Sequence, residues 1–186
     1  MSEKTPKINS DGRTGSEIVF ALGCSSLGKV LVAHGANGIC AILLGDEPQR
    51  LIGDLGALFA RDRLIGAEAS PDATLSSAVE AAVQAVEAPW RKFDPPLDIR
   101  GTEFQRRVWR ELREIPAGTT TSYTEIARRI GAPKALRAVA GACAANVLAI
   151  AIPCHRVLRS NGSLSGYRWG MERKRQLIER EQSHRA

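Results

Sequence analysis

Two short motifs in the second half of the chain constrain its fold more strongly than any other feature. Thr102 and Gln105 stand three residues apart, as do Ser122 and Glu125, and each pair matches the capping box that begins an α-helix. The first motif is followed by apolar residues at helical spacing, namely Phe104, Val108, Leu112 and Ile115. We therefore expect one helix over residues 102–114 and a second that starts at Ser122 and stops at Gly131.

A third helix is expected after the second, because Pro133 stands where a first helical turn would begin. Two helices joined by about three residues form a helix-turn-helix. One side of the third helix should pack inward, with Leu136, Val139, Ala140 and Cys143. The other side is small or basic, with Lys134, Ala138, Gly141, Ala142 and Ala145, and Arg137 at its edge. Such a face suits a closely approaching nucleic-acid groove, and the alternative is packing against the first half of the chain.

Residues 150–157 carry the clearest candidate for chemistry. An apolar run ends at Pro153, which restricts its own backbone and that of Ile152, and Cys154 and His155 follow. A thiol reacts as its thiolate, so a neighbouring imidazole can activate it. Adjacent residues on a strand point to opposite faces, so His155 reaches the sulfur only through a bend or a bridging water. The alternative is a buried core cysteine beside a solvated histidine.

Charge divides the chain into unlike halves. Residues 1–99 hold 9 Lys and Arg against 13 Asp and Glu, a net charge of −4, whereas residues 100–186 hold 17 against 7, a net charge of +10. A basic half is typical of proteins that bind a polyanion through its phosphates. A solvated, arginine-rich surface would give the same count.

The first half predicts an α/β support domain in a chain of mixed α/β (α+β) class. Residues 1–16 are polar and indicate a flexible tail. Aliphatic runs at 18–22, 29–33 and 39–44 predict a three-stranded antiparallel sheet. Helices are expected over 49–60, capped by Asp46, and over 71–87. Prolines at 89, 95 and 96 mark a linker, so the predicted units are the tail, a support domain at 17–94 and a mainly helical domain at 95–186.

The four cysteines show no Cys-x-x-Cys spacing, so neither disulfides nor a metal site is expected. Cys24, His34 and Cys40 could approach one another across neighbouring strands, but three ligands are one short of a closed structural zinc site. No run approaches about 18 apolar residues, and the polar start lacks the apolar core of a signal peptide. We expect a cytoplasmic protein without membrane contact.

From Gly101 to about Glu181 the chain closely resembles the O6-alkylguanine-DNA alkyltransferases. Their hallmark is Pro-Cys-His-Arg followed by an aliphatic residue, which stands here at residues 153–157. Further matches lie at 101–105, 122–123, 137–139, 142–146 and 165–170, and the alkyltransferase half of the Ada proteins is the most similar branch. The resemblance implies direct-reversal DNA repair by a monomer bound to double-stranded DNA. One alkyl group, mainly methyl, would pass irreversibly from O6-alkylguanine, or O4-alkylthymine, to a cysteine without a cofactor.

The same resemblance assigns roles in the chemistry. Cys154 is the nucleophile, His155 takes its proton through a water, and Glu181 completes the relay. Tyr123 and Lys174 are expected to neutralise the departing guanine, the lysine through the tyrosine or the cysteine carbonyl. Lys174 and Glu181 share one stripe of a closing helix from Met171, which is either an exposed edge or a functional pair that faces inward.

The resemblance also assigns residues to the DNA and to the base pocket. Arg137 should enter the stack that the damaged base leaves, with the small face of its helix in the minor groove. Asn146 should tie this helix to the active-site segment; a simple helix C-cap is the competing account, and we expect both to hold. The base pocket should be lined by Val157, Ser163, Tyr167, Arg168 and Trp169. Trp169 is expected to narrow this pocket, so that methyl adducts are accepted and benzyl adducts poorly.

Two other functions fit parts of the sequence. A DNA-binding thiol sensor would use Cys154 as a switch, yet a helix that reads sequence would carry Asn, Gln or Arg instead of Ala and Gly. A thiol hydrolase built from Cys154, His155 and Glu181 would leave Arg137 and the basic half without a role.

Overall fold

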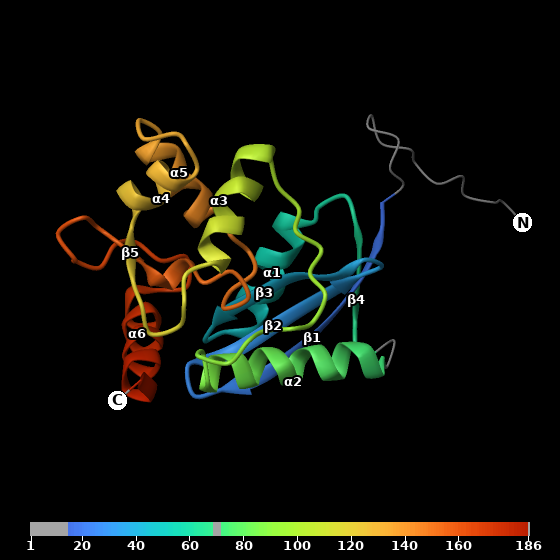
Figure 1. The fold of residues 1–186 in the computed structure, drawn as a ribbon. Coiled ribbons are helices and arrows are strands. Elements are labelled where there is room, and N and C mark those ends of the chain that lie inside the picture. Colours follow the sequence, from blue (N-terminus) through green and yellow to red (C-terminus); the bar gives the residue numbers. More distant parts are fainter. Residues whose placement is uncertain (1–14, 69–71, 186) are drawn as a thin grey trace, which may run out of the picture.

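The structure is a computed structural model that describes residues 15–68 and 72–185 (Figure 1). The predicted tail at 1–16 lies almost entirely outside the described residues. The strands are β1 (Glu17–Ser25), β2 (Gly28–Gly35), β3 (Gly38–Gly45), β4 (Arg63–Gly66), β5 (Thr121–Ser122) and β6 (Val157–Leu158). The helices are α1 (Pro48–Leu58), α2 (Ala73–Glu87), α3 (Glu103–Arg113), α4 (Tyr123–Arg129), α5 (Leu136–Ala144), the 3₁₀ turn η1 (Cys154–Arg156) and α6 (Met171–Arg185). The mixed α/β class is confirmed.

The sheet of the first half has the strand order β3-β2-β1-β4. The predicted antiparallel meander of β1, β2 and β3 is confirmed by their pairing. The fourth strand, β4, was not predicted, and it pairs in parallel with β1. Its four residues are too few to show a period of their own, so only the tertiary pairing identifies it.

Helices cover both faces of this sheet, which explains why its inner strands are apolar throughout. Along β2, Val30 and Val32 belong to the core cluster beneath α2, while Leu31 and Ala33 belong to the cluster beneath α1. This alternation follows from the two-residue period of a strand. The helix predicted over 49–60 begins instead at Pro48, and Asp46 does not cap it, because the N-cap is Glu47 without a side-chain bond.

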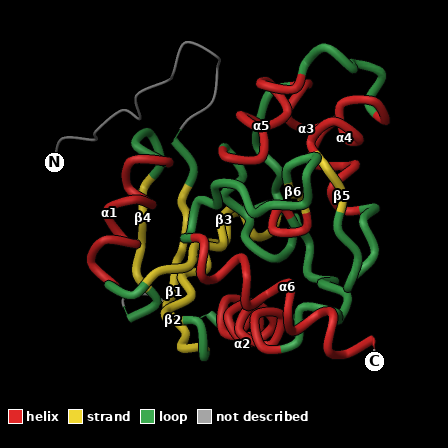
Figure 2. Tube along the Cα trace, turned by 90° about the vertical axis from the view of Figure 1, so that its left-hand side faces the viewer, coloured by secondary structure: helices red, strands yellow, loops and turns green. Residues whose placement is uncertain are grey.

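Of the helices of the second half, α3, α4 and α5 lie together on the side away from α1, whereas α6 lies beside α2 (Figure 2). The Thr102 and Gln105 capping box is complete in α3. Ser122 accepts from the Glu125 N–H at the start of α4, but the Glu125 carboxylate pairs with Arg128 and Arg129 instead of returning to the cap. The helix predicted to start at Pro133 starts at Leu136.

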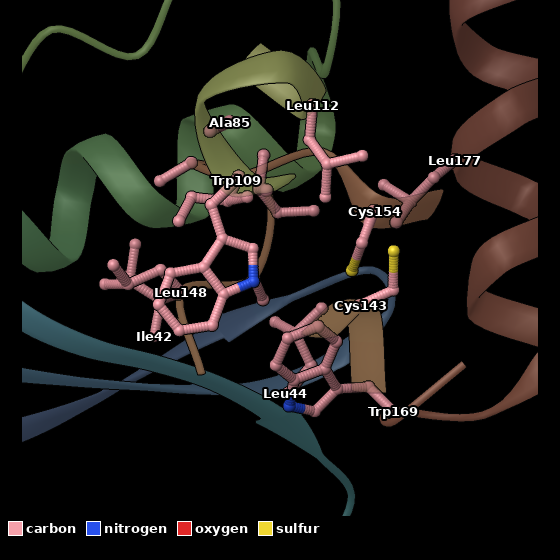
Figure 3. Close-up of a cluster of buried hydrophobic side chains, with 14 of the residues drawn as sticks. Ile42, Leu44, Ala85, Trp109, Leu112, Cys143, Leu148, Cys154, Trp169 and Leu177 are labelled. Atoms are coloured by element: carbon pink, nitrogen blue, oxygen red, sulfur yellow. The ribbon is translucent and has the colours of Figure 1, made fainter. Parts of the chain in front are cut away.

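One apolar core joins the two halves. Ile42 of β3 bridges to Leu148, and both lie in the same buried cluster as Trp109, Cys143 and Cys154 (Figure 3). The domain boundary at 94–95 therefore stays a prediction. No helix within 15–68 or 72–185 is long and apolar enough to cross a membrane.

Candidate active site

The backbone bends sharply just before the candidate nucleophile. Ile150 has a φ of 67°, and it is the only described residue other than glycine with a positive φ. Such a conformation costs about 1–3 kcal/mol and is found mostly where the fold imposes it. Pro153 then leads into the 3₁₀ turn η1, so Cys154 and His155 do not lie on a flat strand. The bend expected from the proline is confirmed.

Cys154 and His155 are both buried, and His155 is held by a carboxylate from α6. His155 Nε2 lies 2.9 Å from Glu181 Oε1. A carboxylate only accepts hydrogen bonds, so Nε2 carries the proton and Nδ1 keeps the lone pair. His155 Nδ1 is buried and has no hydrogen-bond partner among the described residues. The imidazole is therefore fixed in the form that can accept a proton at Nδ1.

Arg156 is a partner of this relay that the sequence did not reveal. Its Nε and Nη2 donate to Glu181 over 2.8–3.1 Å, its Nη1 donates to the Ile115 carbonyl at 2.5 Å, and its Nη2 to the Pro89 carbonyl at 3.2 Å. Glu181 also accepts from the Gly118 N–H at 3.0 Å. A buried carboxylate with this many donors stays ionised and fixed in place. The pair of α6 charges at Lys174 and Glu181 thus faces inward, with both side chains at 1% exposure or less.

Burial sets the protonation states of the relay. It raises the pKa of Cys154 to about 11, although the hydrogen bond from Asn146 and the charge of Lys174 oppose the rise. Burial also lowers the pKa of His155, against the opposing pull of Glu181. Burial alone would raise the pKa of Glu181, but hydrogen bonds from His155 and Arg156 outweigh it and the pKa is lowered. At neutral pH the site therefore holds a neutral thiol, a neutral imidazole and an ionised carboxylate.

Asn146 links the end of α5 to the catalytic turn. Its Nδ2 donates to the Ile152 carbonyl at 2.9 Å and to Cys154 Sγ at 3.3 Å, and its Oδ1 accepts from the Leu148 N–H at 2.9 Å. The tie is present, but the left-handed helix cap that we also expected of Asn146 is wrong, because Asn146 has no positive φ and the C-cap, Ala145, is right-handed.

A second polar chain reaches the pocket from α6. Lys174 Nζ donates to the Val157 carbonyl at 2.6 Å and to Ser165 Oγ at 3.2 Å, and Ser165 Oγ lies 2.7 Å from the Tyr123 hydroxyl. The Lys174 ammonium can only donate hydrogen bonds, so Ser165 Oγ accepts from it. The Ser165 hydroxyl can then donate its own hydrogen bond to the Tyr123 oxygen. Of the two predicted routes for Lys174, the described residues offer the one through the tyrosine, by way of Ser165, and no hydrogen bond joins Lys174 to the Cys154 carbonyl. Nothing in the sequence pointed to Ser165 beyond its place in a matching segment.

The pocket beside Cys154 has a volume of about 760 Å³. It is bordered by Tyr123 and Thr124 of α4, by Leu136, Arg137, Ala140, Cys143 and Ala144 of α5, by Cys154, and by Arg159, Ser160, Asn161, Ser165, Gly166, Tyr167 and Arg168. This size is typical of sites for small organic ligands. Arg137 is exposed at the pocket mouth.

Helix α5 is rotated relative to its predicted orientation. Val139, Ala142 and Cys143 are buried, whereas Leu136 is 45% exposed and Ala140 is exposed. Ala142 is thus excluded from the proposed DNA face, because its carbonyl accepts from Trp109 Nε1 at 2.8 Å in the packing against α3. Of the other residues assigned to this face, Lys134, Ala138 and Gly141 are exposed and Ala145 is half-buried.

Three residues assigned to the pocket wall do not border the pocket. Val157 is fully buried, Ser163 bonds to Asn161 within its own loop, and Trp169 is only 6% exposed. Trp169 packs edge-on against Tyr167, with ring centroids 5.1 Å apart, so it supports the wall from behind. The prediction that the Trp169 indole itself narrows the pocket is therefore wrong. Tyr167 and Arg168 do border it.

The alternative metal site does not assemble. Cys24 is opposite Lys29 at one end of the β1–β2 pair. His34 is opposite Val19 near the other end of that pair, and Cys40 lies close to His34 on the neighbouring strand β3, so Cys24 is remote from both. Within the described residues, no group of three or more His, Cys, Asp or Glu side chains could hold a metal ion.

The chain is similar to known proteins over most of its length. Residues 103–183 match the family model described as 6-O-methylguanine DNA methyltransferase, DNA binding domain. The chain is similar to the bifunctional transcriptional activator/DNA repair enzyme Ada of Escherichia coli K12, with 51% identity over 163 residues, which cover 87% of this chain and 45% of that protein. It is also similar to the methylated-DNA–protein-cysteine methyltransferase of Mycolicibacterium paratuberculosis, with 55% identity over 93 residues, which cover 50% of this chain and 56% of that protein. The chain thus spans about half the length of these curated relatives.

Solved structures extend the similarity over most of the chain. The crystal structure of Mycobacterium tuberculosis O6-methylguanine methyltransferase matches with 36% identity and a TM-score of 0.69, covering 89% of this chain and 93% of that one. A structure of the M. tuberculosis protein in complex with DNA matches with a TM-score of 0.70 and 36% identity, covering 90% of this chain and 93% of that one.

Proposed function

The chain belongs to the O6-methylguanine DNA methyltransferase family, and on that premise we propose that it repairs O6-alkylated guanine in double-stranded DNA by transferring the alkyl group to Cys154. O4-alkylated thymine is a further proposed substrate. One observation carries the proposal: Cys154 borders an open pocket while the adjacent His155 is fixed by the buried Glu181. Nucleophile and base thus occupy a single turn, between the pocket and the core.

The lesion must leave the base stack before any protein atom can reach O6. The exposed face of α5 supports such a binding mode. Arg137 stands at the pocket mouth, where it can fill the place of the extruded base. A Cβ built at Gly141 would meet nothing within 4 Å, so the protein's own packing does not require glycine there. A DNA backbone that approaches α5 closely would explain why a small residue stands at Gly141.

The transfer step is a displacement at the alkyl carbon. His155 Nδ1 takes the Cys154 proton through a water, and the resulting imidazolium is stabilised by Glu181. The sulfur forms a bond to the alkyl carbon as the bond from that carbon to guanine O6 breaks, and the electron pair goes to the guanine. Generating the thiolate only when a base is bound suits a thiol whose pKa is about 11 at rest.

The departing guanine needs a proton, and Tyr123 is placed to give it. Burial raises the pKa of Tyr123, so the hydroxyl stays protonated at neutral pH. Because Ser165 can donate to the tyrosine oxygen, the Tyr123 hydrogen is free to point into the pocket. Lys174 donates to Ser165 from the buried side and so polarises the hydrogen bond between Ser165 and Tyr123. The thioether product is stable, so we propose one turnover per molecule.

A single polypeptide supplies the pocket, the His155–Glu181 relay and the hydrogen bonds that join Lys174, Ser165 and Tyr123, which supports action as a monomer. All four cysteines are free thiols, which supports a location in the reducing cytoplasm.

The test is incubation with a duplex that contains O6-methylguanine, followed by intact-protein mass and peptide mapping. We expect a gain of about 14 Da, one methyl group in place of a hydrogen, on Cys154. Cys143→Ser is the matched control, because Cys143 borders the same pocket and should be dispensable. A mass gain that persists in Cys154→Ser would refute the assignment, as would one that is lost equally in Cys143→Ser and Cys154→Ser while both variants remain folded.

A further inference from the structure

A second basic pocket lies beside the linker between the two halves. It has a volume of about 470 Å³, and we call it the linker pocket. Its cationic residues are Arg91 and Lys92 of the linker, Arg110 and Arg113 of α3, and Arg156 of the catalytic turn. It shares no bordering residue with the pocket at Cys154, although Pro153 borders one pocket and Cys154 the other.

Three of the five cations of the linker pocket have no counter-charge among the described residues, whereas Lys92 pairs with Asp94 and Arg156 pairs with Glu181. Glu114 is the single acidic residue on its border. Within the described chain, the exposed side chains of Arg91, Arg110 and Arg113 make no hydrogen bond or ion pair.

Some exposed arginines outside the linker pocket are ion-paired. Arg106 of α3 pairs with Glu103 at 3.0 Å, and Arg175 of α6 pairs with Glu172 and Glu179. Like charges that converge without counter-charges repel one another, so a pocket of this kind gains stability from a bound anion.

Aromatic side chains border the same pocket. Trp90 and Phe93 lie beside the cations, and the Trp90 ring is held in place by stacking on His184, with centroids 4.2 Å apart. Cations interleaved with aromatic rings are typical of sites that hold nucleic-acid strands, where phosphates meet the cations and bases meet the rings. An acidic peptide would use the cations but would give the rings no partner.

We propose that the linker pocket binds phosphate groups of a polynucleotide, as a contact separate from the α5 face. The inference rests on the proposed function in that DNA is already the partner. Arg156 belongs to both the linker pocket and the Glu181 relay, so an anion bound here lies one residue from the chemistry.

The experiment compares two double variants with equal loss of charge. Arg110→Gln/Arg113→Gln removes two unpaired cations from the linker pocket. Arg106→Gln/Arg175→Gln removes two exposed, ion-paired cations outside it. The affinity of each full-length protein for an unmodified duplex is measured over a series of salt concentrations, and circular dichroism checks the fold. Binding of thymidine monophosphate and methyl transfer to Cys154 are measured on the same preparations.

We expect the linker-pocket variant to reduce the slope of log K against log salt by about 1–2, because each lost phosphate contact contributes about 0.9. The control variant should change the slope by less than half as much. Equal slopes for the two variants would overturn the proposal, as would a variant that loses only mononucleotide binding, since the site would then belong to a small phosphate ligand. Methyl transfer keeps the two hypotheses apart: a wild-type protein that leaves Cys154 unmethylated refutes the proposed function, whatever the slopes.

Discussion

Replacing Glu181 with glutamine removes the negative charge behind His155 while keeping the side-chain shape. His155 Nε2 lies 2.9 Å from Glu181 Oε1, and both side chains are almost fully buried. A hydrogen bond to a charged group contributes about 1.5–3 kcal/mol, and about 1.36 kcal/mol corresponds to a tenfold change in rate. We therefore expect Glu181→Gln to slow methyl transfer about 10- to 150-fold, because the imidazolium that forms with the thiolate loses its counter-charge.

The same substitution should also lower stability, because Arg156 loses its anionic partner. Arg156 retains the Ile115 and Pro89 carbonyls, and the glutamine oxygen still accepts, so we expect a cost of about 1–3 kcal/mol in the free energy of unfolding.

The assay is single-turnover transfer from a methylated duplex at saturating DNA, at a temperature well below the midpoint of thermal unfolding of the variant. Glu179→Gln is the control, since Glu179 lies on the same helix in an exposed pair with Arg175. A rate for Glu181→Gln within twofold of the wild-type rate would refute the relay.

Three further predictions follow from the site. The pKa of His155 is lowered, so the transfer rate should stay level as pH falls from neutrality to below about 6.5, the ordinary imidazole pKa, and should then decline as the base is protonated; a decline already centred at or above that value would contradict the assignment. Ser165→Ala removes the link between Lys174 and Tyr123 and should lower the transfer rate about 5- to 30-fold, the effect of about 1–2 kcal/mol, with little change in DNA affinity; a loss of DNA affinity without a loss of transfer rate would contradict this role. Gly141→Leu should leave thermal stability unchanged or higher, because a leucine favours a helix by about 1 kcal/mol over glycine, and should weaken duplex binding measured by fluorescence anisotropy; undiminished binding would mean that DNA does not approach this face closely.

The sequence was most informative where structure is determined locally. The capping box at Thr102 and the stop at Gly131 depend on neighbours within a few residues, and both are found where expected. The bend at Pro153 is of the same kind, because proline restricts the backbone by itself.

Features that depend on distant parts of the chain could not be predicted. Strand β4 exists because β1 offers it an edge, and the face that α5 buries is decided by α3 and α4. The sequence around Arg156 does not distinguish it from a solvated arginine, because its partner Glu181 lies 25 positions away on α6. Ser165 is similar, since only the fold places it between Lys174 and Tyr123.

The most direct test of the central claim is a count of methyl groups accepted per molecule when methylated duplex is in large excess. Our account predicts that the reaction stops after one methyl group per chain, with all of it recovered as S-methylcysteine at Cys154. Continued demethylation of the duplex by protein whose Cys154 remains an unmodified thiol would contradict it.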